Sequence, residues 1–115
     1  MTLQILLDPA NEDWFTVCDS TALQSGRGAA ALLPDGRQVA VFVDRAGRAY
    51  AIDNRDPFTG AAVLSRGLLG SSEGRAFVAS PLLKQRFDLE SGACLDDAEV
   101  TVRTYEARLG GPSDS

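Results

Sequence analysis

Short apolar runs, separated by residues that form turns, are the main pattern along this chain of 115 residues. They are clearest in residues 29–54, where two tight-turn sequences, PDG at 34–36 and RAG at 45–47, separate three runs rich in strand formers. This spacing predicts a three-stranded meander. In its middle strand, one set of side chains should face a core while the other is partly solvated or packs on a second sheet. The two sets are Val39, Val41 and Val43, and Ala40, Phe42 and Asp44.

The other apolar runs predict further strands at residues 14–18, 74–80, 85–89 and 99–107. No stretch longer than about two turns has helical periodicity. We therefore expect an all-β fold, a small barrel or sandwich of antiparallel sheets, with at most one short helical turn at residues 19–23.

One compact domain is expected, because a chain of this length buries about two-thirds of its unfolded surface around a single core. Residues 1–12 contain Pro9 and Asn11 and are weakly patterned, so we expect an extended N-terminal arm without a regular element. The domain should occupy residues 13–109, followed by a flexible tail at residues 110–115. Residues 53–74 lack a strand pattern, and a connection of this length is usually functional or a compact packed unit.

The chain is acidic, with 16 Asp and Glu against 11 Lys and Arg and a formal charge of −5. Nucleic acid is a polyanion bound through clustered basic residues, so an acidic domain is an unfavourable partner for it. No apolar run approaches the ~20 residues of a membrane span, and the N-terminus lacks the basic and long apolar regions of a signal peptide. We therefore expect a cytoplasmic protein that binds neither nucleic acid nor a membrane.

Histidine is absent from the sequence. This excludes Ser-His-Asp and Cys-His catalysis and any imidazole ligand to a metal. The two cysteines, Cys18 and Cys94, do not form a CxxC motif, and we expect them to be small buried side chains rather than a disulfide or a redox pair. Most familiar catalytic constellations are therefore missing.

Two loops provide the strongest functional signal: the first loop, residues 54–67 (NRDPFTGAAVLSRG), and the second loop, residues 80–87 (SPLLKQRF). Their frame resembles a Rieske iron–sulfur domain, where Cys-x-His in one loop and Cys-x-x-His in the other bind a [2Fe–2S] cluster. The chain has other residues at all four ligand positions, namely Asp56, Phe58, Ser80 and Leu83. Because clusters need thiolate or imidazole ligands, we expect no cluster and no other metal here. Phe58 and Leu83 are expected to meet between the loops and fill that volume.

Six short sequences in the same order make the resemblance more specific: DPF, VLSRGL, VASPL, KQRF, GACLDD and TYEAR. Together they resemble the small subunit of assimilatory NAD(P)H-dependent nitrite reductase, over residues 14–108. The resemblance implies a Rieske-like fold without a cluster and a non-catalytic role in nitrate and nitrite assimilation. Its partner would be a large subunit that holds siroheme, a [4Fe–4S] cluster, FAD and the NAD(P)H site and reduces nitrite to ammonia. Such domains continue into a closing strand after YEAR, whereas here Leu109 leads directly into GGPSDS.

Polar residues that suit docking lie in the two loops of this acidic chain. They are Arg55, Arg66, Lys84, Gln85 and Arg86. A basic rim around an apolar tip suits contact with another protein. Solubility or structural ion pairs, such as Arg66 or Arg86 with Asp56 or Asp88, explain the basic residues equally well.

Two other functions remain open from the sequence. One is a Rieske-type ferredoxin that carries electrons to an oxygenase, against which the absence of histidine argues. The other is a stand-alone β-domain that binds a protein or a small ligand. A deep pocket between the loops would favour this last function.

Overall fold

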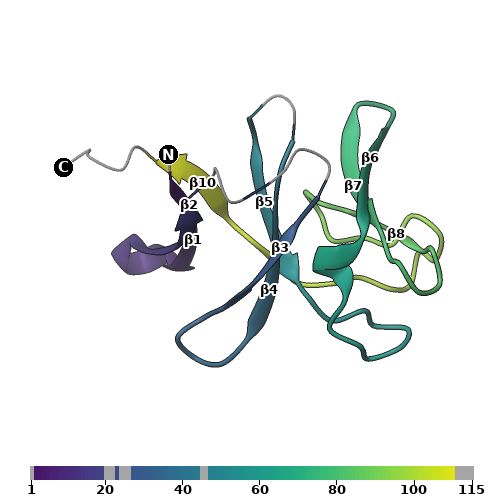
Figure 1. The fold of residues 1–115 in the computed structure, drawn as a ribbon, viewed down its shortest axis with the longest axis horizontal. Coiled ribbons are helices and arrows are strands. Elements are labelled where there is room, and N and C mark those ends of the chain that lie inside the picture. Colours follow the sequence, from purple (N-terminus) through teal and green to yellow (C-terminus); the bar gives the residue numbers. More distant parts are fainter. Residues whose placement is uncertain (1, 20–22, 24–26, 45–46, 111–115) are drawn as a thin grey trace.

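Three antiparallel sheets follow one another along the longest dimension of the molecule, which measures 42 Å (Figure 1). The structure is a computed structural model that describes residues 2–19, 23, 27–44 and 47–110. The first sheet, in the order β10-β1-β2, contains β1 (Thr2–Asp8), β2 (Asp13–Asp19) and β10 (Ala107–Gly110). The middle sheet, in the order β3-β4-β5-β9, contains β3 (Ala29–Leu32), β4 (Gln38–Val43), β5 (Ala49–Asp53) and β9 (Thr104–Tyr105). The third sheet, in the order β6-β7-β8, contains β6 (Leu68–Ser72), β7 (Arg75–Ala79) and β8 (Arg86–Asp88).

The fold is all-β, as expected, and its described helical parts are short 3-10 turns at Pro9–Asn11 and Leu64–Arg66. The predicted meander is confirmed: β3, β4 and β5 pair antiparallel in sequence order. The turn expected at residues 19–23 falls largely on residues 20–22, which lie outside the described residues. Among the residues that the structure describes, no helix is long and apolar enough to cross a membrane.

The middle sheet separates two hydrophobic cores. Val39 and Val41 point into the core shared with the first sheet, where they pack with Leu3 and Ile5. Phe42, one position along, points into the core shared with the third sheet. The alternation along β4 therefore places apolar side chains on both faces, because a second sheet covers the face that is not turned to the first. The core with the third sheet also contains Ala40, Tyr50, Ile52, Leu64, Val78, Phe87, Leu89, Cys94 and Val102.

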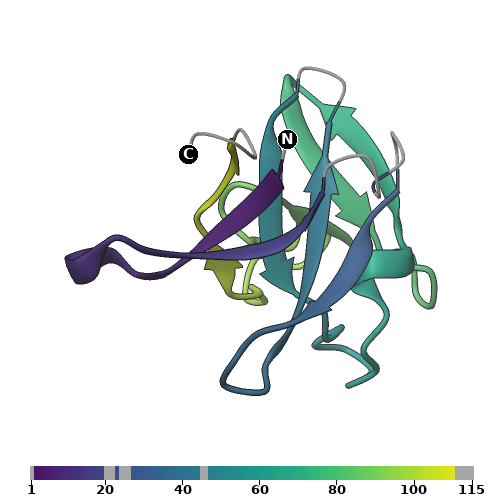
Figure 2. The ribbon, with the colours of Figure 1, turned by 60° about the vertical axis from the view of Figure 1, so that its left-hand side comes forward.

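The N-terminal segment is a regular strand, so the prediction of an irregular arm is wrong. Strand β1 is the central strand of the first sheet, and Leu3 and Ile5 within it are fully buried. Pro9 lies beyond the strand, in the 3-10 turn that leads towards β2 at the far end of a projecting hairpin (Figure 2). The breaker residues therefore end β1 instead of preventing it.

The closing strand is present and is supplied by residues 107–110. Strand β10 pairs with β1 from Thr2 opposite Gly110 to Ile5 opposite Ala107, which brings the two ends of the described chain side by side (Figure 1). The expected tail, residues 110–115, begins inside this strand at Gly110, and residues 111–115 lie outside the described residues.

Two other boundaries differ from the sequence prediction. Residues 99–107 do not form one strand: only Thr104–Tyr105 belong to β9, although Val100 and Val102 pack against the core. Residues 53–74 are not wholly irregular, because Leu68–Ser72 form β6 by pairing with β7. The sequence LLGSS is a weak strand former, and its conformation depends on this partner.

Candidate functional site

Asp56 and Ser80 join the two loops inside the protein. The Ser80 hydroxyl donates a hydrogen bond to Asp56 Oδ2 at 2.6 Å, and the other carboxylate oxygen accepts the Phe58 backbone N–H at 2.8 Å. Asp56 is fully buried and Ser80 is 1% exposed. The two positions where the Rieske frame has cysteines therefore lie next to each other and are linked by a direct hydrogen bond.

The first loop folds around the backbone of Asp56 and the side chain of Asn54. The Asp56 carbonyl accepts from Gly60 N at 2.7 Å, and the Asp56 amide donates to Ala61 O at 2.8 Å. The buried Asn54 side chain accepts from Ser65 N at 2.7 Å. A loop with its own internal hydrogen bonds is the compact packed unit that its length indicated.

The second loop is a tight turn around Ser80. The Ser80 amide donates to Gln85 O at 2.8 Å, and Lys84 N donates back to Ser80 O at 3.1 Å. Lys84 has a φ of 67°, and the Ser80 hydroxyl also accepts from Leu82 N at 3.3 Å. Ser80 therefore orders its own loop while it bonds to the first one.

The volume between the loops is filled differently from the prediction. Phe58 packs against the core, with its ring centroid 6.2 Å from that of Phe87. Leu83, which was expected to meet Phe58, is 53% exposed. The expectation that both side chains fill this volume is therefore wrong for Leu83, because the tight turn directs it towards solvent.

These residues do not fit a [2Fe–2S] cluster. Asp56 and Ser80 use their oxygen atoms on each other and on the loop backbone, and Phe58 and Leu83 have no donor atom. Cys94 is buried in the core and Cys18 lies on β2, so neither thiol is in the loops. Across the described ranges there is no group of three or more His, Cys, Asp or Glu side chains that could hold a metal ion.

The candidate docking residues have different environments. Arg86 forms an ion pair with Asp96 at 3.0 Å, and its guanidinium holds the pKa of Asp96 below its usual range. Asp88 forms its ion pair with Arg75. The ion pairs predicted from the sequence, which joined Arg66 or Arg86 to Asp56 or Asp88, are therefore wrong. Arg66 and Lys84 are exposed and make no ion pair with any described residue. Gln85 has a buried Oε1 without a hydrogen-bond partner among the described residues.

Arg55 lies in a depression that sequence reasoning did not identify. The depression has a volume of about 410 Å³, and Arg37, Arg55, Arg103, Asp53 and Tyr105 contribute to its lining. Tyr105 donates to Asp53 at 2.6 Å, while the guanidiniums of Arg37 and Arg103 lie 5.3 and 5.1 Å from the centre of its ring. These residues are widely spaced in sequence and meet only because β9 pairs with β5, so no local motif could reveal them.

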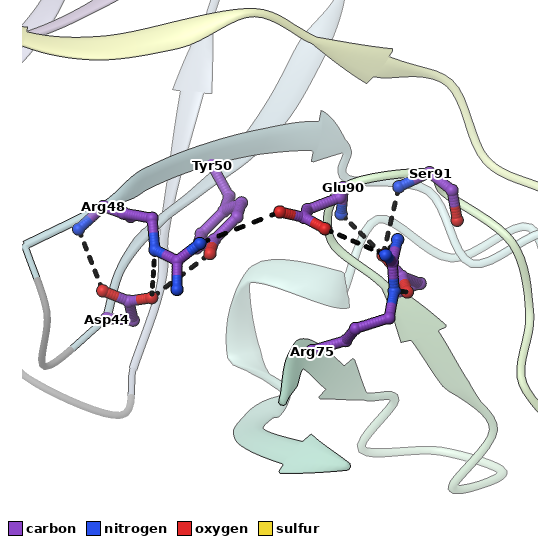
Figure 3. A network of polar contacts seen from close by, with 7 residues as sticks. Asp44, Arg48, Tyr50, Arg75, Glu90 and Ser91 are labelled. Carbon is purple, nitrogen blue, oxygen red and sulfur yellow. Dashed lines mark hydrogen bonds and ion pairs between the residues drawn. The ribbon is translucent and has the colours of Figure 1, made fainter. Parts of the chain in front are cut away.

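An ionic network connects the middle and third sheets (Figure 3). Glu90 lies between Arg48 of the β4–β5 turn, at 3.9 Å, and Arg75 of β7, at 3.2 Å. Arg75 also bonds to both oxygens of Asp88, which is 3% exposed and accepts the backbone amides of Glu90 and Ser91. The hydrogen bond from Arg75 is the main reason that the pKa of Asp88 is lowered. The network therefore stabilises the turn that follows β8.

Comparison with known proteins agrees with this geometry. The Rieske-like [2Fe-2S] domain family matches residues 13–113. The nitrite reductase (NADH) small subunit of Salmonella typhimurium is 43% identical over 97 residues, which cover 84% of this chain and 89% of that protein. A crystal structure assigned as an NADH-dependent nitrite reductase small subunit from Mycobacterium tuberculosis has a TM-score of 0.79 and 45% identity, covering 86% of this chain and 97% of that one.

A third relative has a different organisation. The nitrite reductase [NAD(P)H] large subunit of Klebsiella oxytoca is 42% identical over 97 residues, which cover 84% of this chain but only 10% of that protein. In that protein a segment similar to this chain is therefore part of the large-subunit polypeptide. This chain belongs to the family of nitrite reductase small subunits, built on the Rieske-like [2Fe-2S] domain.

Proposed function

We propose that this protein is the non-catalytic small subunit of a cytoplasmic NAD(P)H nitrite reductase, which works by associating with the large subunit in nitrate and nitrite assimilation. The observation that carries the proposal is the Klebsiella oxytoca large subunit, in which a segment 42% identical to this chain belongs to the same polypeptide. Domains joined in one chain are held at high effective concentration, which favours contact between them. When the same domain is a separate chain, a specific interface must provide that contact.

The chemistry of nitrite reduction belongs, in this proposal, to the large subunit, with siroheme, a [4Fe–4S] cluster, FAD and the NAD(P)H site. The small subunit has no histidine, and its loop positions offer no ligand set for a cluster. Its own residues therefore maintain a folded surface. Asp56 and Ser80 hold the two loops together, and the second loop presents Leu82, Leu83 and Lys84 to solvent.

Docking through the loop region is the role proposed for the polar residues selected from the sequence, Arg55, Arg66, Lys84, Gln85 and Arg86. Arg66 and Lys84 suit this role best, since both are exposed and neither has an ion pair with a described residue. Arg86 already pairs with Asp96, and Arg55 lies in the separate depression around Tyr105.

Co-expression with the siroheme-containing large subunit of the same organism tests the proposal. The two chains are expected to co-purify, and the large subunit alone should have reduced NAD(P)H-dependent nitrite reduction or reduced stability. Addition of the purified small subunit should restore the lost activity or stability of the large subunit. Failure to co-purify, together with full activity of the large subunit alone, would overturn the proposal.

A further inference from the structure

Exposed leucines gather at one end of the third sheet. The described residues contain five large hydrophobic side chains that are strongly exposed, and four of them lie in β6, in the second loop or just after β8. These four are Leu68 (65% exposed), Leu82 (49%), Leu83 (53%) and Leu95 (43%). Single exposed apolar residues are normal on a protein surface, but a group of them in one place marks an interaction surface.

The strand register shows that Leu68 and Leu95 share one face of the sheet. Leu68 pairs with Ala79, Ala79 pairs with Arg86, and Leu95 N donates to Arg86 O at 2.7 Å. Residues opposite each other in antiparallel strands have side chains on the same face, so these four positions form one row across the sheet. The adjacent row has the opposite orientation and points into the core; it contains Leu69, Val78, Phe87 and Cys94. The row with Leu68 and Leu95, called the leucine row because it contains them, is therefore on the outer face of the sheet.

Phe77 extends this outer face by one more row. It lies two residues before Ala79 and opposite Gly70, where a Cβ atom would be 2.6 Å from the Phe77 ring. The Arg86 guanidinium lies 5.6 Å from the centre of the same ring. The ring therefore lies over Gly70 and beside the Arg86 guanidinium, so an aromatic side chain also lies on the outer face.

The second loop continues the surface beyond the end of the strands. It connects β7 to β8 at the end where Ala79 and Arg86 lie, so Leu82 and Leu83 follow directly after the leucine row. Hydrogen bonds from Lys84 N and Leu82 N to Ser80, and from the Ser80 hydroxyl to Asp56, hold this loop in one shape before any partner binds. A preordered loop loses little conformational entropy on binding, which favours its use as an anchor.

We propose that this leucine face, made up of Leu68, Phe77, Leu82, Leu83 and Leu95, is the surface that docks on the nitrite reductase large subunit. The inference rests on the proposed function, in which the large subunit is the partner because a similar segment is part of the Klebsiella oxytoca large subunit. Lys84 in the loop and Arg66, two residues before Leu68, form no ion pair with any described residue. They place positive charge beside the leucines of a chain whose formal charge is −5. The complementary surface is therefore apolar, with carboxylates at its edge.

Variants of the exposed leucines test the proposal, because their side chains add little to the folded core. The double variant Leu82→Ser/Leu83→Ser and the single variant Leu68→Ser change two different parts of the face, the second loop and strand β6. The chain provides a matched control in Leu32→Ser, since Leu32 is 63% exposed but lies on β3 of the middle sheet. All variants are first checked for an unchanged unfolding midpoint, and their affinity for the purified large subunit is then measured by calorimetry.

The double variant should bind at least about tenfold more weakly, as removal of central apolar anchors usually does, whereas Leu32→Ser should bind like the wild type. Lys84→Glu should also weaken binding, with a smaller effect at high salt. Wild-type affinity of both leucine-face variants would overturn the location of the interface and leave the proposed function intact. An equal loss of affinity in Leu32→Ser would also overturn this location of the interface, because such a loss would indicate nonspecific apolar contact. Absence of binding by the wild type would overturn both proposals.

Discussion

The Ser80 hydroxyl lies 2.6 Å from Asp56 Oδ2, although the two residues are 24 positions apart and belong to different loops. In the Rieske frame the corresponding positions hold the two cysteines that bind one iron, so the metal cross-links the loops. Here a hydrogen bond between buried side chains makes the same connection. The loops therefore keep their mutual arrangement without a cluster, and the second loop can present Leu82 and Leu83 as a fixed surface.

Replacement of Ser80 with alanine should destabilise the protein by about 1–3 kcal/mol, because Asp56 Oδ2 then lies buried without its hydrogen-bond donor. Urea denaturation followed by fluorescence measures the change in the free energy of unfolding. Ser71→Ala is the control, since Ser71 is an exposed serine on β6, and its effect should stay within about 0.5 kcal/mol. Equal effects of the two substitutions would show that the Asp56–Ser80 bond does not hold the loops together.

Gly92 and Gly60 provide a second matched comparison, because both have a φ of 79°. An ideal Cβ at Gly92 would lie 2.1 Å from Val102 O, whereas a Cβ at Gly60 meets nothing within 4 Å. Gly60→Ala should therefore cost about 1–2 kcal/mol from backbone conformation alone. Gly92→Ala should cost at least about 2 kcal/mol more, because the chain at Val102 must move. Similar losses of unfolding free energy in the two variants would contradict the close approach.

Features that depend on neighbouring residues could be predicted from the sequence. The meander of β3, β4 and β5 follows from tight turns and from a side-chain period of two, and both valines at 39 and 41 are buried as that period requires. These signals are local in the chain. The meeting of Asp56 and Ser80, 24 positions apart, is instead expected from the resemblance of the two loops to the Rieske frame.

Features that depend on distant partners could not be predicted in this way. Strand β1 buries Leu3 and Ile5 because β10, more than 100 residues later, pairs with it. Strand β6 exists because β7 provides its hydrogen bonds. The outward direction of Leu83 depends on the tight turn around Ser80, and the depression at Arg55 depends on the pairing of β9 with β5. Each of these features depends on tertiary contacts, which the secondary-structure propensities of the residues do not describe.

Replacement of Asp88 with asparagine should lower stability at neutral pH by about 1–3 kcal/mol, since the amide keeps the acceptor for Glu90 N and Ser91 N but loses the charged pair with Arg75. The pKa of Asp88 is lowered in the folded protein. Its contribution is therefore present above the unfolded pKa of about 3.9 and is lost as the pH falls through the folded value. Denaturation curves from pH 7 to pH 3 should show the wild type approaching the variant at the acid end. If the difference in unfolding free energy between the wild type and the variant stayed constant across this pH range, the Asp88 ion pair would not be its source.

Tyr105 should make stability depend on alkaline pH. Burial, with a hydrogen bond to Asp53, raises its pKa from 10.0 to about 12. The unfolded state thus loses the proton first, and stability should fall as the pH rises from about 10 to about 12. Tyr105→Phe should reduce this slope and leave the part due to Tyr50, whose pKa burial also raises. It should cost about 1 kcal/mol at neutral pH for the lost hydrogen bond. Ultraviolet titration in a Tyr50→Phe background observes Tyr105 alone, because the chain has two tyrosines; ionisation near pH 10 would contradict the structure.

Restoring the four ligands tests whether the loops still form a Rieske frame. Asp56→Cys and Ser80→Cys place thiols where the present side chains already meet, and Phe58→His and Leu83→His supply the imidazoles. After anaerobic reconstitution with iron and sulfide, the quadruple variant is expected to bind about two irons per chain and to show the visible charge-transfer bands of a His₂Cys₂ cluster. The double cysteine variant is the control and should lack this spectrum, because it has no histidine. Absence of iron in a folded quadruple variant would show that the loops have moved away from the Rieske arrangement. Two irons bound by the wild type would instead revive the ferredoxin alternative and exclude a cofactor-free subunit.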